Sequence, residues 1–223
     1  MKYPVVMLNV KTYLESLGKN GLKLAKICQE VAKETGASIV ICPQVTDLAK
    51  VVEEVEIPVY AQHIDPYEPG GHTGAVSAEA IKEIGCEGTL INHSENRLKL
   101  ADIEFNIQRA KKIGLKTVVC TNNIATSCAA AAMCPDTIAV EPPELIGSGI
   151  PVSKAQPDVV LNTVNSVRNI NKEVHILCGA GISTGEDVKS AIKLKTEGVL
   201  LASGVVKAKD PKSVLMNMAQ NLL

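Results

Sequence analysis

Residues 103–140, IEFNIQRAKKIGLKTVVCTNNIATSCAAAAMCPDTIAV, carry the pattern that decides the fold of this chain. Apolar spacing and β-branched runs predict helix, strand, helix and strand in turn, over Ile103–Ile113, Thr117–Thr121, Ala125–Met133 and Thr137–Val140. Gly114 stands where the first helix should stop, as expected of a left-handed C-terminal cap. The two strand runs are apolar almost throughout, which is typical of strands covered on both faces.

The same alternation runs through the rest of the 223 residues. The other predicted strands are Pro4–Asn9, Ser38–Cys42, Pro58–Gln62, Thr89–Asn92, His175–Cys178 and Val199–Ala202. The other predicted helices are Leu22–Ala32, Val45–Val52, Ala78–Ile84, Val159–Asn169, Val188–Leu194 and Pro211–Leu222. Eight strands that alternate with helices, in a chain of this length, favour a closed parallel (β/α)8 barrel of the TIM-barrel type over an open doubly wound sheet. We therefore expect one α/β domain spanning residues 1–223.

Composition narrows the kinds of partner. The net charge is −1 and aromatic residues make up only 2% of the chain, so no surface for nucleic acid is expected. No apolar run approaches membrane-spanning length, and the N-terminus lacks the pattern of a secretion signal. An anionic ligand would therefore have to be held by a few local groups, such as a lysine and backbone N–H groups.

The chain has seven cysteines, an odd number, and none stands in a Cys-x-x-Cys pair. Cys42, Cys120 and Cys178 end predicted strands, where small apolar residues pack. Buried, reduced thiols explain this placement better than disulfides or zinc ligands do, and they favour a cytoplasmic location. The four histidines are too scattered to predict a metal site.

Polar residues close several predicted strands, at the end of a barrel where catalytic loops gather. Asn9 and Lys11 would leave the first strand on one side if that strand continues so far, although a solvated loop lysine has the same spacing. His93 precedes Ser94-Glu95, which looks like the first turn of a helix. The positive potential of a helix N-terminus favours a neutral imidazole that donates a hydrogen bond, and a hydrogen-bonded core histidine is the alternative.

Glu141 interrupts an apolar strand end and precedes two prolines, Pro142 and Pro143. A carboxylate held against such a stiff, partly desolvated edge gains basicity, which suits a general base, whereas an ordinary surface acid would simply be solvated. The segment that follows ends in Gly147-Ser148-Gly149 and has prolines at both ends, an arrangement that resembles a hinged lid.

Two small-residue turns follow the last two predicted strands. They are Cys178-Gly179-Ala180-Gly181 and Ala202-Ser203-Gly204. Backbone N–H groups and the start of a short helix can approach phosphate oxygens at such turns, because no large side chain intrudes. Together the two turns predict a phosphate-ester substrate.

In order and spacing, these motifs resemble the triosephosphate isomerase family, and in particular its shorter archaeal branch, over nearly the whole chain. The family's Asn-x-Lys appears as Asn9-Val10-Lys11, its His-Ser-Glu as His93-Ser94-Glu95, and the start of its lid as Glu141-Pro142. The lid would close with Ile146-Gly147-Ser148-Gly149. The resemblance implies interconversion of dihydroxyacetone phosphate and D-glyceraldehyde 3-phosphate through an enediolate, without cofactor or metal.

The resemblance also implies a role for each residue. Glu141 would be the base, His93 the neutral electrophile and Lys11 the cation that binds the substrate and steadies the enediolate. Glu95 would hold these residues in place without contacting the substrate. The remaining substrate-binding residues would be Asn9, Ile146, Gly181, Ala202 and Ser203. The chain departs from the family pattern at Asn92, where glycine is common, in a lid without tryptophan, and in its last two turns.

Gln62 and the loop at residues 70–76 resemble the interdigitating subunit loop of the family. The resemblance therefore implies a homo-oligomer. The archaeal branch implies a tetramer, with a dimer as the alternative.

Two other classes of function stay open. A different phosphate-binding barrel enzyme, such as a sugar-phosphate epimerase or an aldolase, would need a second acid/base, a metal site or a Schiff-base lysine inside the barrel. A non-catalytic barrel could bind phosphorylated metabolites or serve as an assembly module. The presence of Lys11, His93 and Glu141 together argues against the second class.

Overall fold

The computed structural model describes residues 1–142, 155 and 157–222, and its strands form one eight-stranded sheet in the order β2-β1-β8-β7-β6-β5-β4-β3. The strands are β1 (Val5–Asn9), β2 (Ser38–Cys42), β3 (Tyr60–Ala61), β4 (Gly88–Ile91), β5 (Lys116–Thr121), β6 (Thr137–Val140), β7 (His175–Gly179) and β8 (Gly198–Leu201). All the pairings are parallel. A single bridge between Ile41 and Val59 joins β2 to β3 and closes the ring. The predicted (β/α)8 barrel is confirmed.

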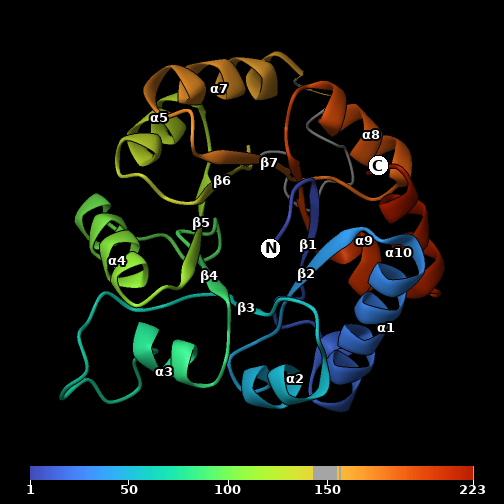
Figure 1. The fold of residues 1–223 in the computed structure, drawn as a ribbon, viewed down its shortest axis with the longest axis horizontal. Helices are drawn as coiled ribbons and strands as arrows, with labels where there is room; N and C mark the ends of the chain where they lie inside the picture. Colours follow the sequence, from blue (N-terminus) through green and yellow to red (C-terminus); the bar gives the residue numbers. More distant parts are fainter. Residues whose placement is uncertain (143–154, 156, 223) are drawn as a thin grey trace.

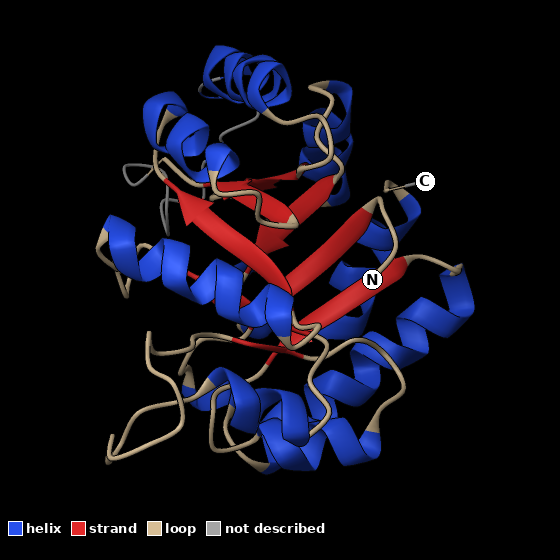
Figure 2. Ribbon diagram, turned by 60° about the vertical axis from the view of Figure 1, so that its left-hand side comes forward, coloured by secondary structure: helices blue, strands red, loops and turns tan. Residues whose placement is uncertain are grey.

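Helices surround the ring of strands (Figures 1 and 2). They are α1 (Lys19–Thr35), α2 (Leu48–Glu54), α3 (Ala78–Glu83), α4 (Leu100–Lys112), α5 (Ile124–Ala132), α7 (Pro157–Ile170), α8 (Gly185–Lys193) and α10 (Pro211–Gln220). Two short segments were not predicted: a 3-10 turn at Leu14–Ser16 after β1, and α9 (Ser203–Val206) after β8. Gly114 has φ +72 just beyond α4, which confirms that the helix stops there.

Alternate residues along each strand face opposite sides of the sheet, and both sides are buried. The side chains that point into the barrel form one apolar cluster: Val5, Met7, Val40, Cys42, Tyr60, Leu90, Val118, Cys120, Ala139, Leu177 and Leu200. Residues at the intervening positions pack against the helices. Because both faces are buried, the sequences of the strands are continuous apolar runs rather than an alternation of apolar and polar residues. It also places Asn9 and Glu141 two residues beyond Met7 and Ala139, on the inward side at the carboxyl end of the barrel.

The seven cysteines lie in the described part of the chain as thiols rather than disulfides, and five of them are buried. The predicted burial of Cys42, Cys120 and Cys178 is confirmed. Cys134 is exposed. Burial raises the pKa of the Cys28 thiol to about 12, because the low-dielectric interior disfavours the thiolate.

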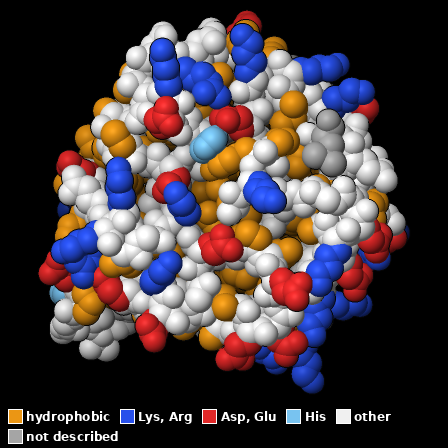
Figure 3. Space-filling view, in the orientation of Figure 1, with side chains coloured by type: hydrophobic (Ala, Val, Ile, Leu, Met, Phe, Trp, Pro, Cys, Tyr) orange, Lys and Arg blue, Asp and Glu red, His pale blue; other side chains and the backbone are white. Residues whose placement is uncertain are grey.

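His175 lies at the amino end of the barrel, away from the predicted site. Its ring stacks on Tyr3 with the ring centroids 3.6 Å apart, and its Nδ1 atom is 2.9 Å from Oε1 of Glu197. On the face of the molecule shown in Figure 3, acidic and basic side chains are interspersed, and hydrophobic side chains are exposed between them. Within the described ranges, no group of three His, Cys, Asp or Glu side chains could hold a metal ion, and no helix is long and apolar enough to cross a membrane.

The loop between β3 and α3 projects from the ring in both ribbon views (Figures 1 and 2). Its base is closed by the Asp65 carboxylate, which accepts a hydrogen bond from the Val76 backbone N–H at 2.7 Å. Nearer the tip, the rings of Tyr67 and His72 stack with centroids 4.3 Å apart. The projection is therefore held in shape by contacts within the loop.

Candidate active site

The carboxyl ends of the strands surround a cavity of about 280 Å³. Its lining residues are Asn9, Lys11, Tyr13, His93, Glu141, Ala180, Gly181, Ile182, Ser183, Leu200, Leu201, Ala202, Ser203 and Gly204. The structure thus gathers the predicted Asn9, Lys11, His93, Glu141, Gly181, Ala202 and Ser203 around one space. Ile146 and the predicted lid at residues 146–149 lie outside the described residues.

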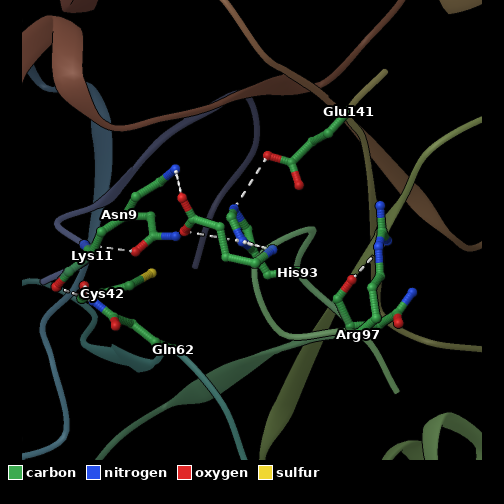
Figure 4. A network of polar contacts seen from close by, with 9 residues as sticks. Asn9, Lys11, Cys42, Gln62, His93, Arg97 and Glu141 are labelled. Atoms are coloured by element: carbon green, nitrogen blue, oxygen red, sulfur yellow. Dashed lines mark hydrogen bonds and ion pairs between the residues drawn. The ribbon is translucent and has the colours of Figure 1, made fainter. Parts of the chain in front are cut away.

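The first strand delivers Asn9 and Lys11, but the chain turns between them. β1 ends at Asn9, as predicted, and Lys11 has a left-handed backbone with φ +51, so the strand does not continue to Lys11. The Lys11 N–H donates to Oδ1 of Asn9 at 3.0 Å, and the Lys11 carbonyl accepts Nε2 of Gln62 at 3.0 Å. These two side-chain hydrogen bonds hold the turn that directs Lys11 into the cavity (Figure 4).

His93 follows β4 by two residues and is only 7% exposed. The helix expected at Ser94-Glu95 is instead a single turn, closed by the Asn96 N–H, which donates to the His93 carbonyl at 2.8 Å. The Glu95 N–H donates to Nδ1 of His93 at 3.2 Å. Nδ1 is therefore an acceptor without a proton, and the ring N–H of the neutral imidazole is at Nε2.

Glu141 follows β6 and is 5% exposed. Its N–H donates to the Thr121 carbonyl of β5 at 2.7 Å, which continues the ladder beyond the strand. Its Oε1 atom lies 3.7 Å from Nε2 of His93, and the two side chains point toward one another (Figure 4). Oε2 is buried without a hydrogen-bond partner among the residues described. Within the described part of the chain, the carboxylate therefore has one oxygen beside the imidazole N–H and one without a hydrogen-bond partner.

Two neighbours reveal how closely the Glu141 side chain is packed. A Cβ atom at Gly179 of β7 would overlap Cγ of Glu141, so only glycine leaves room for this carboxylate. Cys120 of β5 lies below it. Burial, followed by the negative charge of Glu141, raises the pKa of the Cys120 thiol well above its usual value. The thiol stays neutral and adds no second charge to the site.

Lys11 brings positive charge to the cavity. Its Nζ atom is 2.8 Å from Oε1 of Glu95, while Oε2 of Glu95 is 3.5 Å from Nδ1 of His93. The Lys11 side chain is 14% exposed and that of Glu95 57% exposed, so the pair lies at the rim. Glu95 does not line the cavity itself, but it contacts both Lys11, the expected substrate-binding cation, and His93, the expected electrophile.

The turns after β7 and β8 meet on the other side of the cavity. Ala180 and Gly181 are both left-handed, with φ +69 and φ +72. A Cβ at Gly204 would come within 2.9 Å of Cα of Ser183, so the two turns are in direct contact. The cavity also contains Tyr13, for which the sequence carries no signal, with the Lys207 Nζ atom 4.3 Å from the centre of its ring. The small residues of the turns after β7 and β8 leave backbone N–H groups accessible to an anion.

A closed (β/α)8 barrel that gathers a carboxylate, an imidazole, a lysine and two small-residue turns at the carboxyl ends of its strands defines an acid-base enzyme for a small phosphorylated substrate. The family model described as triosephosphate isomerase matches residues 4–221. This chain belongs to the triosephosphate isomerase family, as its motifs predicted. The activity is the interconversion of dihydroxyacetone phosphate and D-glyceraldehyde 3-phosphate, a step of glycolysis and gluconeogenesis. The epimerase, aldolase and non-catalytic alternatives are thereby set aside.

Curated relatives named triosephosphate isomerase agree with this assignment. The protein of Methanocaldococcus jannaschii is 61% identical over 214 residues, covering 96% of this chain and 98% of the relative. Those of Methanobacterium bryantii and Methanothermus fervidus are 58% and 59% identical, covering 98% and 96% of this chain and 97% of each relative. These sources are methanogenic archaea, in agreement with the resemblance to the archaeal branch.

Proposed function

We propose that Glu141, His93 and Lys11 carry out the isomerisation. The observation that supports this assignment is the facing pair in the cavity, with Nε2 of His93 3.7 Å from Oε1 of Glu141 and both side chains nearly buried. A carboxylate beside a neutral imidazole donor provides a base for a carbon-bound proton and a hydrogen-bond donor for the adjacent carbonyl oxygen.

The reaction needs a proton to leave one carbon and return to its neighbour. Glu141 takes the proton from the carbon next to the carbonyl, and the electron pair of that C–H bond forms the carbon–carbon double bond of the enediolate. The Nε2–H of His93 stabilises the oxygen that gains charge, and Lys11 adds positive potential. The hydroxyl proton of the enediolate must also pass to the neighbouring oxygen: Nε2–H of His93 donates its proton to the charged oxygen, and Nε2 takes up the proton of the adjacent hydroxyl. Return of the proton from Glu141 to the other carbon then completes the isomerisation. Since nothing is oxidised or reduced overall, these acid-base groups suffice without a cofactor or a metal.

The phosphate group is assigned to the turns after β7 and β8. Gly181, Ala202 and Ser203 line the cavity there, and the first residues of α9 present backbone N–H groups. Asn9 supports the substrate from the β1 side, and Glu95 keeps Lys11 at the rim through the 2.8 Å contact. Ile146 completes the assignment by analogy with the family, from a segment whose structure is not described.

The whole chain, residues 1–223, is proposed to act as one catalytic domain in a cytoplasmic homotetramer, with a dimer as the alternative. The reduced thiols support the location. Support for assembly comes from the projecting loop between β3 and α3 and from Leu100, which is 60% exposed beside a groove between α4 and α5. Sedimentation velocity tests assembly: a species of the single-chain mass, 23.6 kDa, at micromolar concentration would contradict it.

The catalytic assignment is tested by the conversion of glyceraldehyde 3-phosphate, coupled to NADH oxidation through glycerol-phosphate dehydrogenase. Glu141→Gln, prepared identically, should lose turnover by about a thousandfold or more while still binding inorganic phosphate. The variant also serves as the control for a contaminating isomerase. Near-normal turnover in Glu141→Gln would remove Glu141 from the role of base.

A further inference from the structure

Asn92 connects the end of β4 to His93 in a left-handed conformation, with φ +62. Asparagine tolerates this region better than other residues with a side chain, but glycine adopts it without strain. The turn alone therefore does not account for an amide at this position. The amide side chain must be explained by what it contacts.

Both ends of the Asn92 amide are hydrogen-bonded. Nδ2 donates to the Cys120 carbonyl of β5 at 2.9 Å, and Oδ1 accepts the Leu98 N–H at 2.9 Å. The ladder between β4 and β5 ends at the pair Ile91 and Val119, so the amide extends the contact between these strands one position beyond the ladder.

The backbone of Asn92 is held as well. Its carbonyl accepts Nη1 of Arg97 at 3.0 Å. The loop from His93 to Arg97 is therefore tied to Asn92 at both ends. His93 is joined to Asn92 by the peptide bond, and Arg97 and Leu98 are joined to it by hydrogen bonds.

This loop carries the contacts that orient the imidazole. Within it, the Glu95 N–H fixes the tautomer of His93 through Nδ1, and the Glu95 carboxylate reaches Lys11. Cys120, whose carbonyl receives the Asn92 amide, is followed by Thr121, whose carbonyl accepts the N–H of Glu141 at 2.7 Å. One side chain thus links the His93 loop to the stretch of β5 that also holds Glu141.

We propose that Asn92 is a positioning residue for the isomerisation: its amide fixes the loop so that Nε2 of His93 faces the substrate carbonyl beside Glu141. Asn92 does not line the cavity, so it acts through His93 rather than on the substrate. The inference rests on the proposed role of His93.

Two variants separate the amide from the backbone turn. Asn92→Gly keeps the left-handed turn and removes both amide contacts, and Asn92→Asp keeps Oδ1 but replaces the donor to Cys120 with a carboxylate oxygen. Each should lower kcat by about ten- to hundredfold, since small displacements of a catalytic group have such effects. KM should change by less than about threefold, because the phosphate turns are untouched. Asn92→Asp keeps the inference testable if the glycine variant folds poorly.

Lys195→Gly is the matched control. Lys195 has φ +66 in the turn before β8, at the other end of the barrel, so this substitution also places glycine at a left-handed position. It should leave kcat unchanged. An equal loss of kcat in Lys195→Gly would attribute the effect to backbone flexibility and overturn the inference, as would a wild-type kcat in Asn92→Gly or in Asn92→Asp.

A double-mutant cycle with His93→Gln distinguishes positioning from general stability. If Asn92 acts through His93, then Asn92→Gly should lower the kcat of His93→Gln by much less than it lowers the wild-type kcat. Equal factors in both backgrounds would overturn the inference. Normal turnover in His93→Gln alone would instead defeat the proposed role of His93.

The ¹⁵N shifts of the His93 ring should show Nε2–H in the wild type and a mixture of tautomers in Asn92→Gly, and unchanged shifts would count against the inference.

Discussion

The Nε2 atom of His93 lies 3.7 Å from Oε1 of Glu141, although the two residues follow β4 and β6, which are not adjacent in the sheet. β5 lies between them and contributes Cys120 and Thr121 to their support. The relative position of these two proposed catalytic groups is therefore set by the register of three strands.

Glu141→Asp keeps the charge of the proposed base but withdraws the carboxylate by one methylene from the position beside His93. We expect kcat to fall by about a hundredfold or more, because proton transfer depends steeply on the position of the base. Steady-state kinetics in both reaction directions would measure the loss, which should be similar in each because the same carboxylate moves the proton both ways. A kcat within a factor of about three of the wild type would show that the position of the carboxylate is not critical.

Lys11→Met should weaken binding of an anionic substrate analogue by about a hundredfold, since it removes the nearly buried ammonium at the rim. Glu95 then remains beside His93 as an uncompensated negative charge, which adds to the loss. Isothermal titration calorimetry with a phosphorylated hydroxamate analogue would measure the change. Lys195→Met, at the far end of the barrel, supplies the charge-matched control and should bind normally. Equal affinities in the two variants would contradict the role of Lys11.

Gly179→Ala should lower kcat by about a hundredfold with little loss of stability. The nearest atoms to a Cβ at this position all belong to the Glu141 side chain, so the methyl group displaces the proposed base rather than the backbone. Kinetics and thermal unfolding of the same preparation would separate the two effects. In a Glu141→Ala background the substitution should be neutral in stability, and a large destabilisation there would show that Gly179 packs against something other than the base.

Alkaline pH should destabilise the fold through its buried thiols. The pKa of Cys28 is about 12 in the folded chain, because burial disfavours the thiolate, against 9.0 for an unperturbed thiol. Between these two values the unfolded chain has lost a proton that the folded chain keeps, so the free energy of unfolding falls as pH rises. Cys28 alone contributes a fall of about 2 kcal/mol between roughly pH 8.5 and pH 10.5.

Urea titrations across this pH range would measure that fall. Cys28→Ala should make the decline shallower by about the same amount, whatever its effect at neutral pH. Cys134→Ala, which removes an exposed thiol, should leave the slope unchanged. Parallel slopes for the wild type and Cys28→Ala would show that the Cys28 thiol is not protected by folding.

The barrel could be predicted from the sequence because each strand is an apolar run between helical segments and glycine stops, all of which are local patterns. Boundaries were less exact. The third strand, expected over Pro58–Gln62, is only Tyr60–Ala61: Val59 forms just an isolated bridge with Ile41, and beyond the strand the Gln62 side chain donates to the carbonyls of Lys11 and Cys42. Such a contact joins residues far apart in sequence and leaves no local trace.

The gathering of Lys11, His93 and Glu141 could also be predicted, because parallel strands of a barrel share one carboxyl end. The turn at Lys11, the absence of a helix at Ser94 and the contacts of Asn92 could not. The first and third depend in part on side-chain amides that reach distant backbone groups, as Gln62 does at Lys11 and Asn92 does at Cys120. The turn at Ser94 is held by local contacts of His93 with Glu95 and Asn96. The sequence pattern shows which strand carries a residue but not which neighbour completes its hydrogen bonds.

The β2–β3 junction has a consequence for measurement. Only the bridge between Ile41 and Val59 joins these strands in the described structure, and Gln62 spans the junction above it by donating to Cys42 and Lys11. Lys11 stands on the β1–β2 side and Glu95 on the β3–β4 side, so their contact crosses the same junction. A substrate that contacts both sides of this junction would slow hydrogen exchange of the Ile41 backbone amide. Deuterium uptake at Ile41 would therefore report the fraction of the protein that has substrate bound.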